Sequence, residues 1–135
     1  MELALNRVLN RSFLRNHETK ETKERFRDAL KKLLQRLTPE EDEEYNKTWI
    51  RDFLVSTFYG SSFEVNTRKN VDQAIYGKDS RHPWMLMEIK SPGNQAEMPF
   101  LGHFDRKSFC QLVLYYLKEE KGEENREIKH LAVTN

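Results

Sequence analysis

The chain has 135 residues, of which 37% are hydrophobic and 33% are charged, and its one cysteine is Cys110. This length suits a single domain that can bury a hydrophobic core. A lone cysteine excludes an internal disulfide framework and a cysteine-rich zinc site. No apolar run in the sequence approaches the roughly 20 residues of a membrane helix, and the N-terminus lacks the apolar cluster of a signal peptide. We therefore expect a cytoplasmic protein with no membrane partner.

The net charge of +1 conceals two segments of opposite sign. Residues 1–36 hold ten Lys and Arg against five Asp and Glu, whereas residues 37–60 hold six acidic residues against two basic ones. A basic segment beside an acidic one suits DNA contact near a metal site. Two solvated helix faces produce the same pattern, and charge alone favours this second interpretation.

The first sixty residues show the apolar spacing of helices. The pattern over residues 5–13 predicts a first helix, and the apolar stripe of residues 20–37 predicts an amphipathic second helix. Thr38 followed by Pro39 predicts the start of a third helix, with Thr38 as its N-cap, and this helix would end near Gly60. We expect its aromatic residues, which fall at helical spacing, to lie in the core. They are Trp49, Phe53, Phe58 and Tyr59.

From residue 62 onwards the pattern is that of short strands followed by one helix. Residues 62–67 and 70–77 predict two strands, and residues 84–90 predict a third that is apolar on both faces, as in a central strand. Helical spacing returns over residues 106–120, where Cys110 is expected in the core. Residues 128–134 predict a fourth strand.

This order of elements predicts the fold class. Three consecutive strands with short connections can form an antiparallel meander, and the helix that follows makes a crossover that can place the fourth strand parallel to a neighbour. We therefore expect one α/β domain over residues 1–135 with a mixed sheet, in which residues 1–38 add N-terminal helices to a core over residues 39–135. Because Asn135 directly follows a strand, we also expect the chain to be an N-terminal fragment of a longer protein.

Acidic and basic residues lie at the ends of two predicted strands. Glu88 and Lys90 project from the same side of an extended strand. If the strands over residues 70–77 and 84–90 form a hairpin, Asp72 can lie opposite the end of the second strand. Two carboxylates suit Mg²⁺, which binds through few carboxylates and keeps waters and substrate phosphates, and Mn²⁺ can substitute for it.

Such a site would have the chemistry for cutting a nucleic-acid backbone. The metal would polarise a phosphodiester and acidify a bound water. The lysine would orient that water, help to deprotonate it, or counter the charge that builds on the phosphate. The alternative is an ordinary same-face ion pair, which is the usual role of a Glu-x-Lys triplet in a strand.

Asp72 followed by Glu88-Ile89-Lys90 resembles the PD-(D/E)XK nuclease signature, and the predicted order of elements is similar to the αβββαβ restriction-endonuclease-like core of that superfamily. The resemblance implies that Asp72 and Glu88 are metal ligands, that the Ile89 carbonyl is a third ligand, and that Lys90 is the catalytic lysine. Val71 stands where the motif has proline, which is a departure at a loosely held position.

Two further stretches extend this resemblance. Gln111 and Tyr115 match a Q-x-x-x-Y motif of exonuclease and recombination-type branches, and at this spacing they share one helix face. The alternative places Tyr115 in the core and Gln111 on the helix surface. Members often carry a glutamate on the helix before the first strand that reaches a metal-bound water. Glu44, three residues before Lys47, is our choice, and Glu43 stays open.

The chain as a whole resembles the N-terminal nuclease region of long bacterial type II restriction-modification enzymes. In that family an adenine-specific DNA methyltransferase and a target-recognition region follow, so S-adenosylmethionine is expected only downstream. The resemblance implies a Mg²⁺-dependent endonuclease that hydrolyses double-stranded DNA with a metal-activated water in the bacterial cytoplasm. It leaves open a homo-oligomer, a nuclease acting on DNA ends or junctions, and a non-catalytic DNA-binding or docking module that retains the fold.

Arginines recur every four residues in the N-terminal segment, at positions 7, 11 and 15. This stripe suits contact with phosphates, which would make DNA affinity fall with salt. An exposed basic stripe on a solvated helix is the alternative.

Overall fold

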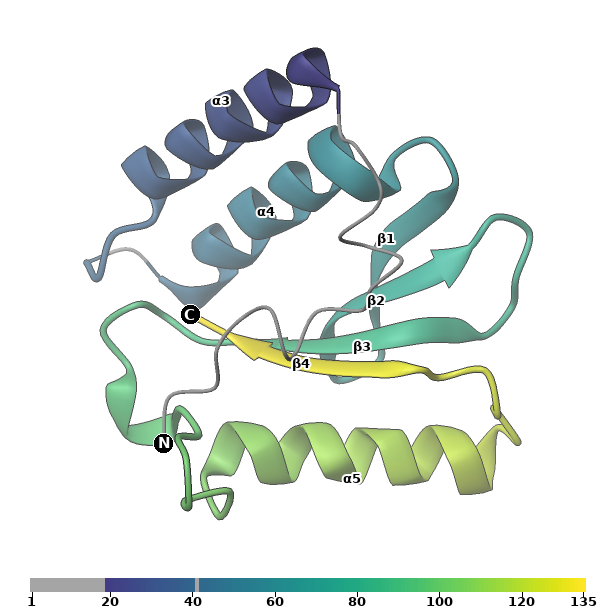
Figure 1. The fold of residues 1–135 in the computed structure, drawn as a ribbon. Coiled ribbons are helices and arrows are strands. Elements are labelled where there is room, and N and C mark those ends of the chain that lie inside the picture. The colour runs from purple at the N-terminus through teal and green to yellow at the C-terminus, as the bar shows by residue number, and fades with distance from the viewer. Residues whose placement is uncertain (1–18, 41) are drawn as a thin grey trace.

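The computed structural model of the chain describes residues 19–40 and 42–135, which form a mixed α/β fold (Figure 1). In this part of the chain three α-helices accompany a four-stranded mixed sheet, which confirms the predicted mixed α/β class. The helix predicted over residues 5–13 and the arginine stripe lie outside the described residues. None of the described helices has the length and apolar character needed to cross a membrane.

Helix α3 spans Lys20–Arg36, as its apolar stripe predicts. The hydroxyl of Thr19 caps its start by accepting a hydrogen bond from the Thr22 N–H at 3.1 Å. Phe26 packs against the Phe53 ring of the next helix, with ring centroids 5.7 Å apart, and Leu33 also contacts the core. The charged residues lie on the outer side of α3 because its inner stripe is the apolar one.

Helix α4 spans Glu43–Leu54, and the predicted start at Thr38 is wrong. Asp42 is the N-cap: its Oδ1 accepts a hydrogen bond from the Tyr45 N–H at 2.7 Å. A carboxylate caps a helix N-terminus better than a threonine because it also interacts favourably with the helix dipole. Glu43 and Glu44 occupy the first turn, as expected for acidic residues.

The helical path continues beyond α4 as a π-helical turn, η1, over Val55–Tyr59. Gly60 ends it by donating its N–H to the Val55 carbonyl at 3.1 Å. A Cβ atom at position 60 would lie 2.4 Å from that carbonyl oxygen, so the turn requires glycine. The wider turn also leaves Phe58 exposed, and its predicted place in the core is wrong.

The sheet has the order β1-β2-β3-β4. The first three strands pair antiparallel as the predicted meander, and β4 pairs parallel to β3. The crossover between β3 and β4 contains helix α5, which spans Lys107–Gly122. A short 3₁₀ helix, η2, precedes it over Gln95–Glu97. The strands are β1 (Phe63–Arg68), β2 (Val71–Gly77), β3 (Pro83–Ile89) and β4 (His130–Thr134).

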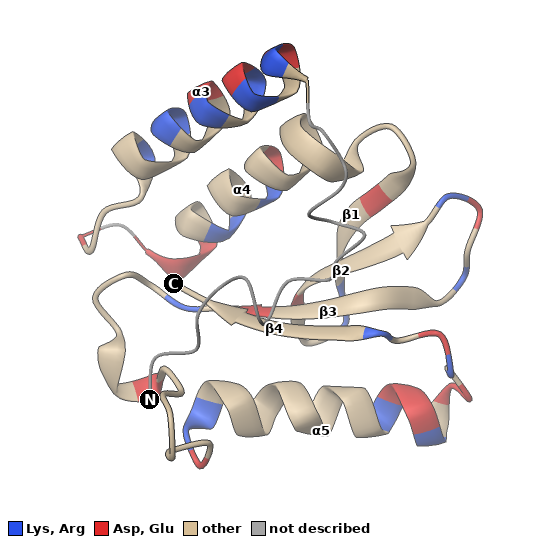
Figure 2. Ribbon diagram, viewed as in Figure 1, with Lys and Arg blue, Asp and Glu red and all other residues tan. Residues whose placement is uncertain are grey.

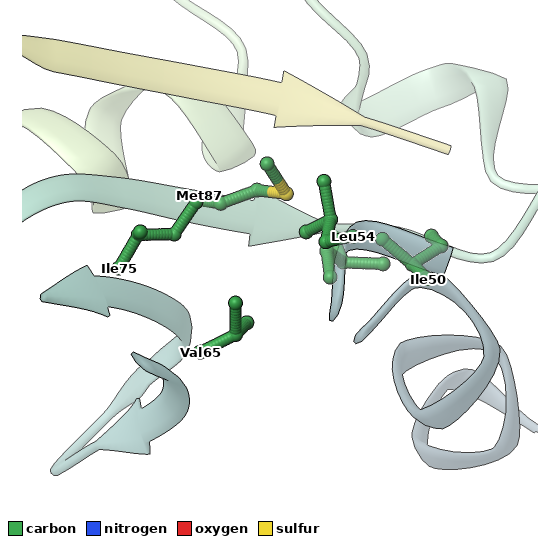
Figure 3. Close-up of a cluster of buried hydrophobic side chains, with 6 residues drawn as sticks. Ile50, Leu54, Val65, Ile75 and Met87 are labelled. Carbon is green, nitrogen blue, oxygen red and sulfur yellow. The ribbon is translucent and has the colours of Figure 1, made fainter. Parts of the chain in front are cut away.

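Helices cover both faces of this sheet, with α3 and α4 on one side and α5 on the other (Figure 1). Figure 3 shows Ile50 and Leu54 of α4 pointing toward Val65, Ile75 and Met87 of the sheet. A second cluster lies between the sheet and α5. It contains Val71, Ala74, Leu86 and Leu112. Strand β3 therefore buries apolar side chains on both faces, as a central strand does.

Cys110 is exposed on α5, so its predicted place in the core is wrong. The residues from 109 to 117 are almost all apolar, and Leu114 and Leu117 are exposed with Cys110. Because apolar residues surround α5, their spacing did not select the face that packs on the sheet.

Candidate active site

Carboxylates and amines gather where β2 begins and β3 ends. The antiparallel register pairs Gln73 with Met87, so Asp72 lies beside the end of β3, next to Glu88. Asp72 Oδ2 accepts a hydrogen bond from the Ile89 N–H at 2.8 Å, which fixes its carboxylate against the neighbouring strand. Figure 2 shows charged residues at this end of the sheet, from the start of α4 to the start of α5. The strand pairing predicted from the sequence is present.

Glu88 and Lys90 form a buried ion pair rather than a surface one. Their relative exposures are 2% and 6%, and Lys90 Nζ lies 2.8 Å from Glu88 Oε1. Glu88 Oε2 is buried and has no hydrogen-bond partner among the described residues. A buried carboxylate oxygen without a partner is costly, so this oxygen is available to a bound water or ligand.

Burial and neighbouring charges set the protonation of this pair. Burial raises the pKa of Glu88, and the negative charges of Asp72 and Glu43 act in the same direction, while the hydrogen bond from Lys90 opposes them. Burial alone would lower the pKa of Lys90. The hydrogen bond to Glu88 and the charges of Glu88, Glu43 and Asp72 outweigh burial, so the pKa of Lys90 lies above its usual value. Lys90 is therefore an ammonium at neutral pH.

Lys47 of α4 joins the site, and sequence reasoning assigned it no role there. Its Nζ lies 2.8 Å from Asp72 Oδ1, 3.1 Å from Glu43 Oε1 and 2.7 Å from Glu44 Oε1, and 12% of its side chain is exposed. Burial alone would lower the pKa of Lys47, but these three carboxylates raise it. The signal in the sequence was the spacing of Glu43 and Glu44 four and three residues before Lys47.

The two glutamates at the start of α4 take different positions. The Glu44 side chain is 81% exposed and reaches only the outer side of Lys47. The Glu43 side chain is 34% exposed and lies between the two lysines, with its Oε1 3.1 Å from Lys47 Nζ and 3.8 Å from Lys90 Nζ. The structure therefore brings Glu43, the residue left open from the sequence, closer to the strand end than Glu44.

Gln111 and Tyr115 lie on α5, and Tyr115 is close enough to Glu88 and Asp72 for their charges to act on it. The pKa of Tyr115 is raised by burial and by the negative charges of Glu88 and Asp72, and Gln111 acts in the opposite direction. Gln111 Oε1 is buried without a hydrogen-bond partner among the described residues. Tyr115 also packs against the apolar cluster under α5, so it is a packing residue and a neighbour of the site at once.

Glu97 and Lys107 extend the charged cluster beyond Lys90, and no sequence pattern predicted either residue at the site. Glu97 Oε2 lies 3.8 Å from Lys90 Nζ, and Glu97 Oε1 lies 3.1 Å from Lys107 Nζ. The hydrogen bond from Lys107 lowers the pKa of Glu97. Both residues flank the β3–α5 loop, whose path depends on tertiary packing rather than on a local pattern.

The donors at this site fit Mg²⁺ better than a soft metal. The carboxylates of Asp72 and Glu88 and the Ile89 carbonyl offer oxygen atoms, which are the ligands that Mg²⁺ prefers, and Glu88 Oε2 has no hydrogen-bond partner within the described residues. No group of three or more His, Cys, Asp or Glu side chains within residues 19–40 and 42–135 is arranged to hold a metal. A site with two carboxylates would therefore need waters and substrate oxygens to complete an octahedral shell.

An open polar groove runs from Asp72 between α4 and the β1–β2 turn. Besides Asp72, its lining holds three basic residues and one further acidic residue, namely Lys47, Arg51, Lys69 and Glu44, together with the polar side chains of Thr48, Thr67 and Asn70. Lys69 also lines two neighbouring pockets, which it shares with Lys118 and Lys121 of α5. A groove of this composition can accommodate a polyanion next to the carboxylates.

These features define a mixed α/β domain that carries a buried carboxylate–lysine cluster at one end of its sheet. The chain belongs to the family described as Domain of unknown function (DUF7149), whose model matches residues 3–135. No curated protein and no solved structure matches the chain.

Proposed function

We propose that this domain is a Mg²⁺-dependent DNA endonuclease of the PD-(D/E)XK type, the nuclease part of a bacterial type II restriction-modification enzyme. The observation that carries the proposal is the buried pair of Glu88 and Lys90 with the partly buried Asp72 at adjoining strand ends. The order α4-β1-β2-β3-α5-β4 supports a restriction-endonuclease-like core. The mixed sheet, with β4 parallel to β3, is consistent with that core.

Asp72 and Glu88, with the Ile89 carbonyl, would hold the metal. When bound, Mg²⁺ supplies polarisation of the phosphodiester and a lower pKa for a bound water. Asp72 is positioned for this role because the Ile89 N–H holds one of its oxygens at 2.8 Å. Glu88 is positioned by Lys90, which leaves its second oxygen unpartnered within the described part of the chain.

Lys90 would act as a cation rather than as a base. Its pKa is raised, so it stays protonated at neutral pH and can donate hydrogen bonds to a phosphate oxygen or to the attacking water. Gln111 Oε1 offers a buried acceptor that can orient the water, and Tyr115 supports Gln111 from the next turn of α5.

Double-stranded DNA is the proposed substrate, and the groove between α4 and the β1–β2 turn is its proposed approach to Asp72. Arg51 and Lys69 line this groove and would neutralise phosphates without reading the sequence. In a longer enzyme, sequence choice would belong to the methyltransferase and target-recognition parts.

Asp72→Asn tests the proposal. It keeps the shape of the side chain but removes its charge, so Mg²⁺-dependent cleavage of duplex DNA should fall by about 100-fold or more, as expected when a charge-stabilising group is lost. The measurement is nicking and linearisation of supercoiled plasmid with Mg²⁺ or Mn²⁺. Asp79→Asn, at an exposed turn between β2 and β3, is the matched control and should cut like the wild type. Undiminished cutting by a clean Asp72→Asn preparation would refute the assignment.

A non-catalytic DNA-binding or docking module is the second candidate. The observation that favours it is the Lys47 ammonium on Asp72, which already satisfies the carboxylate without a metal. Such a module would bind duplex DNA with an affinity that falls with salt but does not change with Mg²⁺. Fluorescence anisotropy with labelled duplex, measured with Mg²⁺ and with a chelator, separates the two candidates.

A further inference from the structure

Both oxygens of the Asp72 carboxylate already have a donor. Oδ2 accepts the Ile89 N–H at 2.8 Å, and Oδ1 lies 2.8 Å from Lys47 Nζ. The first donor belongs to the backbone of β3 and stays in place. The second is the end of a flexible side chain on another element, so it is the donor that can leave.

The charge around Lys47 explains why an ammonium occupies this position. Glu43, Glu44 and Asp72 all lie within 3.1 Å of its Nζ, and the negative charges of Glu43 and Asp72 act on the nearby Glu88. Like charges gathered at a partly buried position repel one another unless cations lie between them. Without a metal, Lys47 and Lys90 are the cations that separate these carboxylates.

We propose that Lys47 is the resident cation of the site: its ammonium holds Asp72 until a divalent metal binds, and it then swings outward to Glu44. The proposal rests on the proposed function in one respect, because it takes Asp72 and Glu88 as the metal-binding pair. It adds the regulation of that pair, since metal affinity is then set by competition with a side chain of the protein.

The geometry gives Lys47 a reason and a path to move. Two cations on one carboxylate oxygen repel each other strongly where solvent screening is weak. Glu44 already lies 2.7 Å from Lys47 Nζ, and its side chain is 81% exposed, so a small change in the four-carbon stem moves the charge toward water without losing a partner. Lys90 has no second carboxylate at a comparable distance, because Glu43 and Glu97 both lie 3.8 Å from its Nζ.

Lys47→Met removes the competing charge and keeps the apolar stem. We expect Mn²⁺ to bind this variant at least ~10-fold more tightly than the wild type by isothermal titration calorimetry, as is typical when a group contacting a metal ligand is changed. Its thermal unfolding temperature should also rise with Mn²⁺ more steeply than that of the wild type. Adding Asp72→Asn to the variant should abolish both effects.

Arg68→Met is the matched control. It also removes one positive charge and a partly buried ion pair, because Arg68 Nε lies 2.7 Å from Glu119 Oε1. This pair joins β1 to α5 and does not touch Asp72. The control should therefore bind Mn²⁺ with wild-type affinity, even where it is less stable. Equal tightening in both variants would show a general charge effect and overturn the proposal.

A second measurement needs no folded variant. In the wild type, the Lys47 side chain is 12% exposed and held by three carboxylates, so an acetylating reagent should modify it slowly. Saturating Mn²⁺ should increase its modification several-fold by mass spectrometry, while Lys20, which is 91% exposed on α3, should not change. If Lys47 stays protected from acetylation at saturating Mn²⁺, the proposal is overturned. It is also overturned if neither the wild type nor Lys47→Met binds Mn²⁺.

Failure of this proposal and failure of the proposed function give different results. If Lys47→Met tightens Mn²⁺ binding through Asp72 but the wild type cuts no DNA, the proposal about Lys47 holds and the proposed endonuclease function is wrong. If Asp72→Asn abolishes cleavage while Lys47→Met leaves Mn²⁺ affinity unchanged, the endonuclease stands and the resident cation falls.

Discussion

Glu88 and Lys90 depend on each other because both are buried. An exposed pair of this kind is worth at most about 1 kcal/mol, whereas breaking a buried pair leaves an uncompensated charge. The pair also leaves one carboxylate oxygen, Oε2 of Glu88, without a hydrogen-bond partner within the described residues, and the charge of Asp72 acts on this carboxylate. A Glu-x-Lys triplet usually forms an exposed ion pair. Here both side chains are buried, so each needs the other for stability, and together they form the centre of the candidate site.

Lys90→Met should lower the free energy of unfolding by about 3 kcal/mol near neutral pH, because the Glu88 charge is left buried alone. The loss should shrink as the pH falls. Glu88 has a raised pKa that rises further without Lys90, so the folded state binds more protons than the unfolded state and acid favours folding. Urea unfolding at about pH 8 and about pH 5.5 measures this difference. An equal loss at both values would contradict the buried-charge explanation. Cleavage should be lost at either pH.

At the scale of elements, the start of α4 decides which side chains reach the strand ends. The helix begins after Asp42, and its first turn carries Glu43 and its second Lys47. Because Asp42 accepts a hydrogen bond from the Tyr45 N–H, the turn that carries Glu43 begins with a satisfied backbone donor. The capping carboxylate of Asp42 is therefore part of what positions the site, although it lies outside it.

Asp42→Ala should lower the free energy of unfolding by about 1 kcal/mol, because the Tyr45 N–H loses its acceptor. Thr38→Ala removes the residue expected from the sequence to be the cap, and it should cost less than about 0.5 kcal/mol. Chemical denaturation of the two variants compares the two possible helix starts directly. A larger cost at Thr38 would place the functional cap there.

At the scale of the whole molecule, helices cover both faces of the sheet, and charged residues gather at one of its ends (Figure 2). Groups from α4, from the ends of β2 and β3, and from the β3–α5 loop meet there. The basic groove extends from the same point along the β1–β2 turn. On the proposed function, this groove is the path by which DNA would reach Asp72.

Lys69→Gln should weaken duplex DNA binding uniformly across sequences, and it should reduce the slope of log affinity against log salt concentration by about 1. Lys69 is suited to this test because its side chain is 64% exposed at the rim of the groove and pairs only with Glu123 within the described residues. Lys20→Gln, on the outer helix α3, should leave the slope unchanged. Anisotropy titrations at several salt concentrations measure both, and equal effects would assign the binding to charge in general.

Local patterns were sufficient for most of the elements. Apolar spacing predicted α3, and the alternation along β3 predicted that Glu88 and Lys90 share a face, because both depend only on backbone geometry. The predictions failed where the sequence offered two possible helix caps or more than one apolar helix face. Asp42 rather than Thr38 is the N-cap of α4. Cys110 lies on an apolar face of α5 that is exposed instead of packed on the sheet.

By itself, the sequence determined the class of fold, the order of the elements and the pairing of Asp72 with the end of β3. Only the tertiary structure decided that Glu88 and Lys90 are buried, that Glu43 rather than Glu44 faces them, and that Lys47 lies on Asp72. The physical reason is the distance along the sequence over which the interactions act. Helix and strand patterns arise from neighbours along the chain, whereas burial and pKa shifts arise from side chains that packing brings together from distant elements.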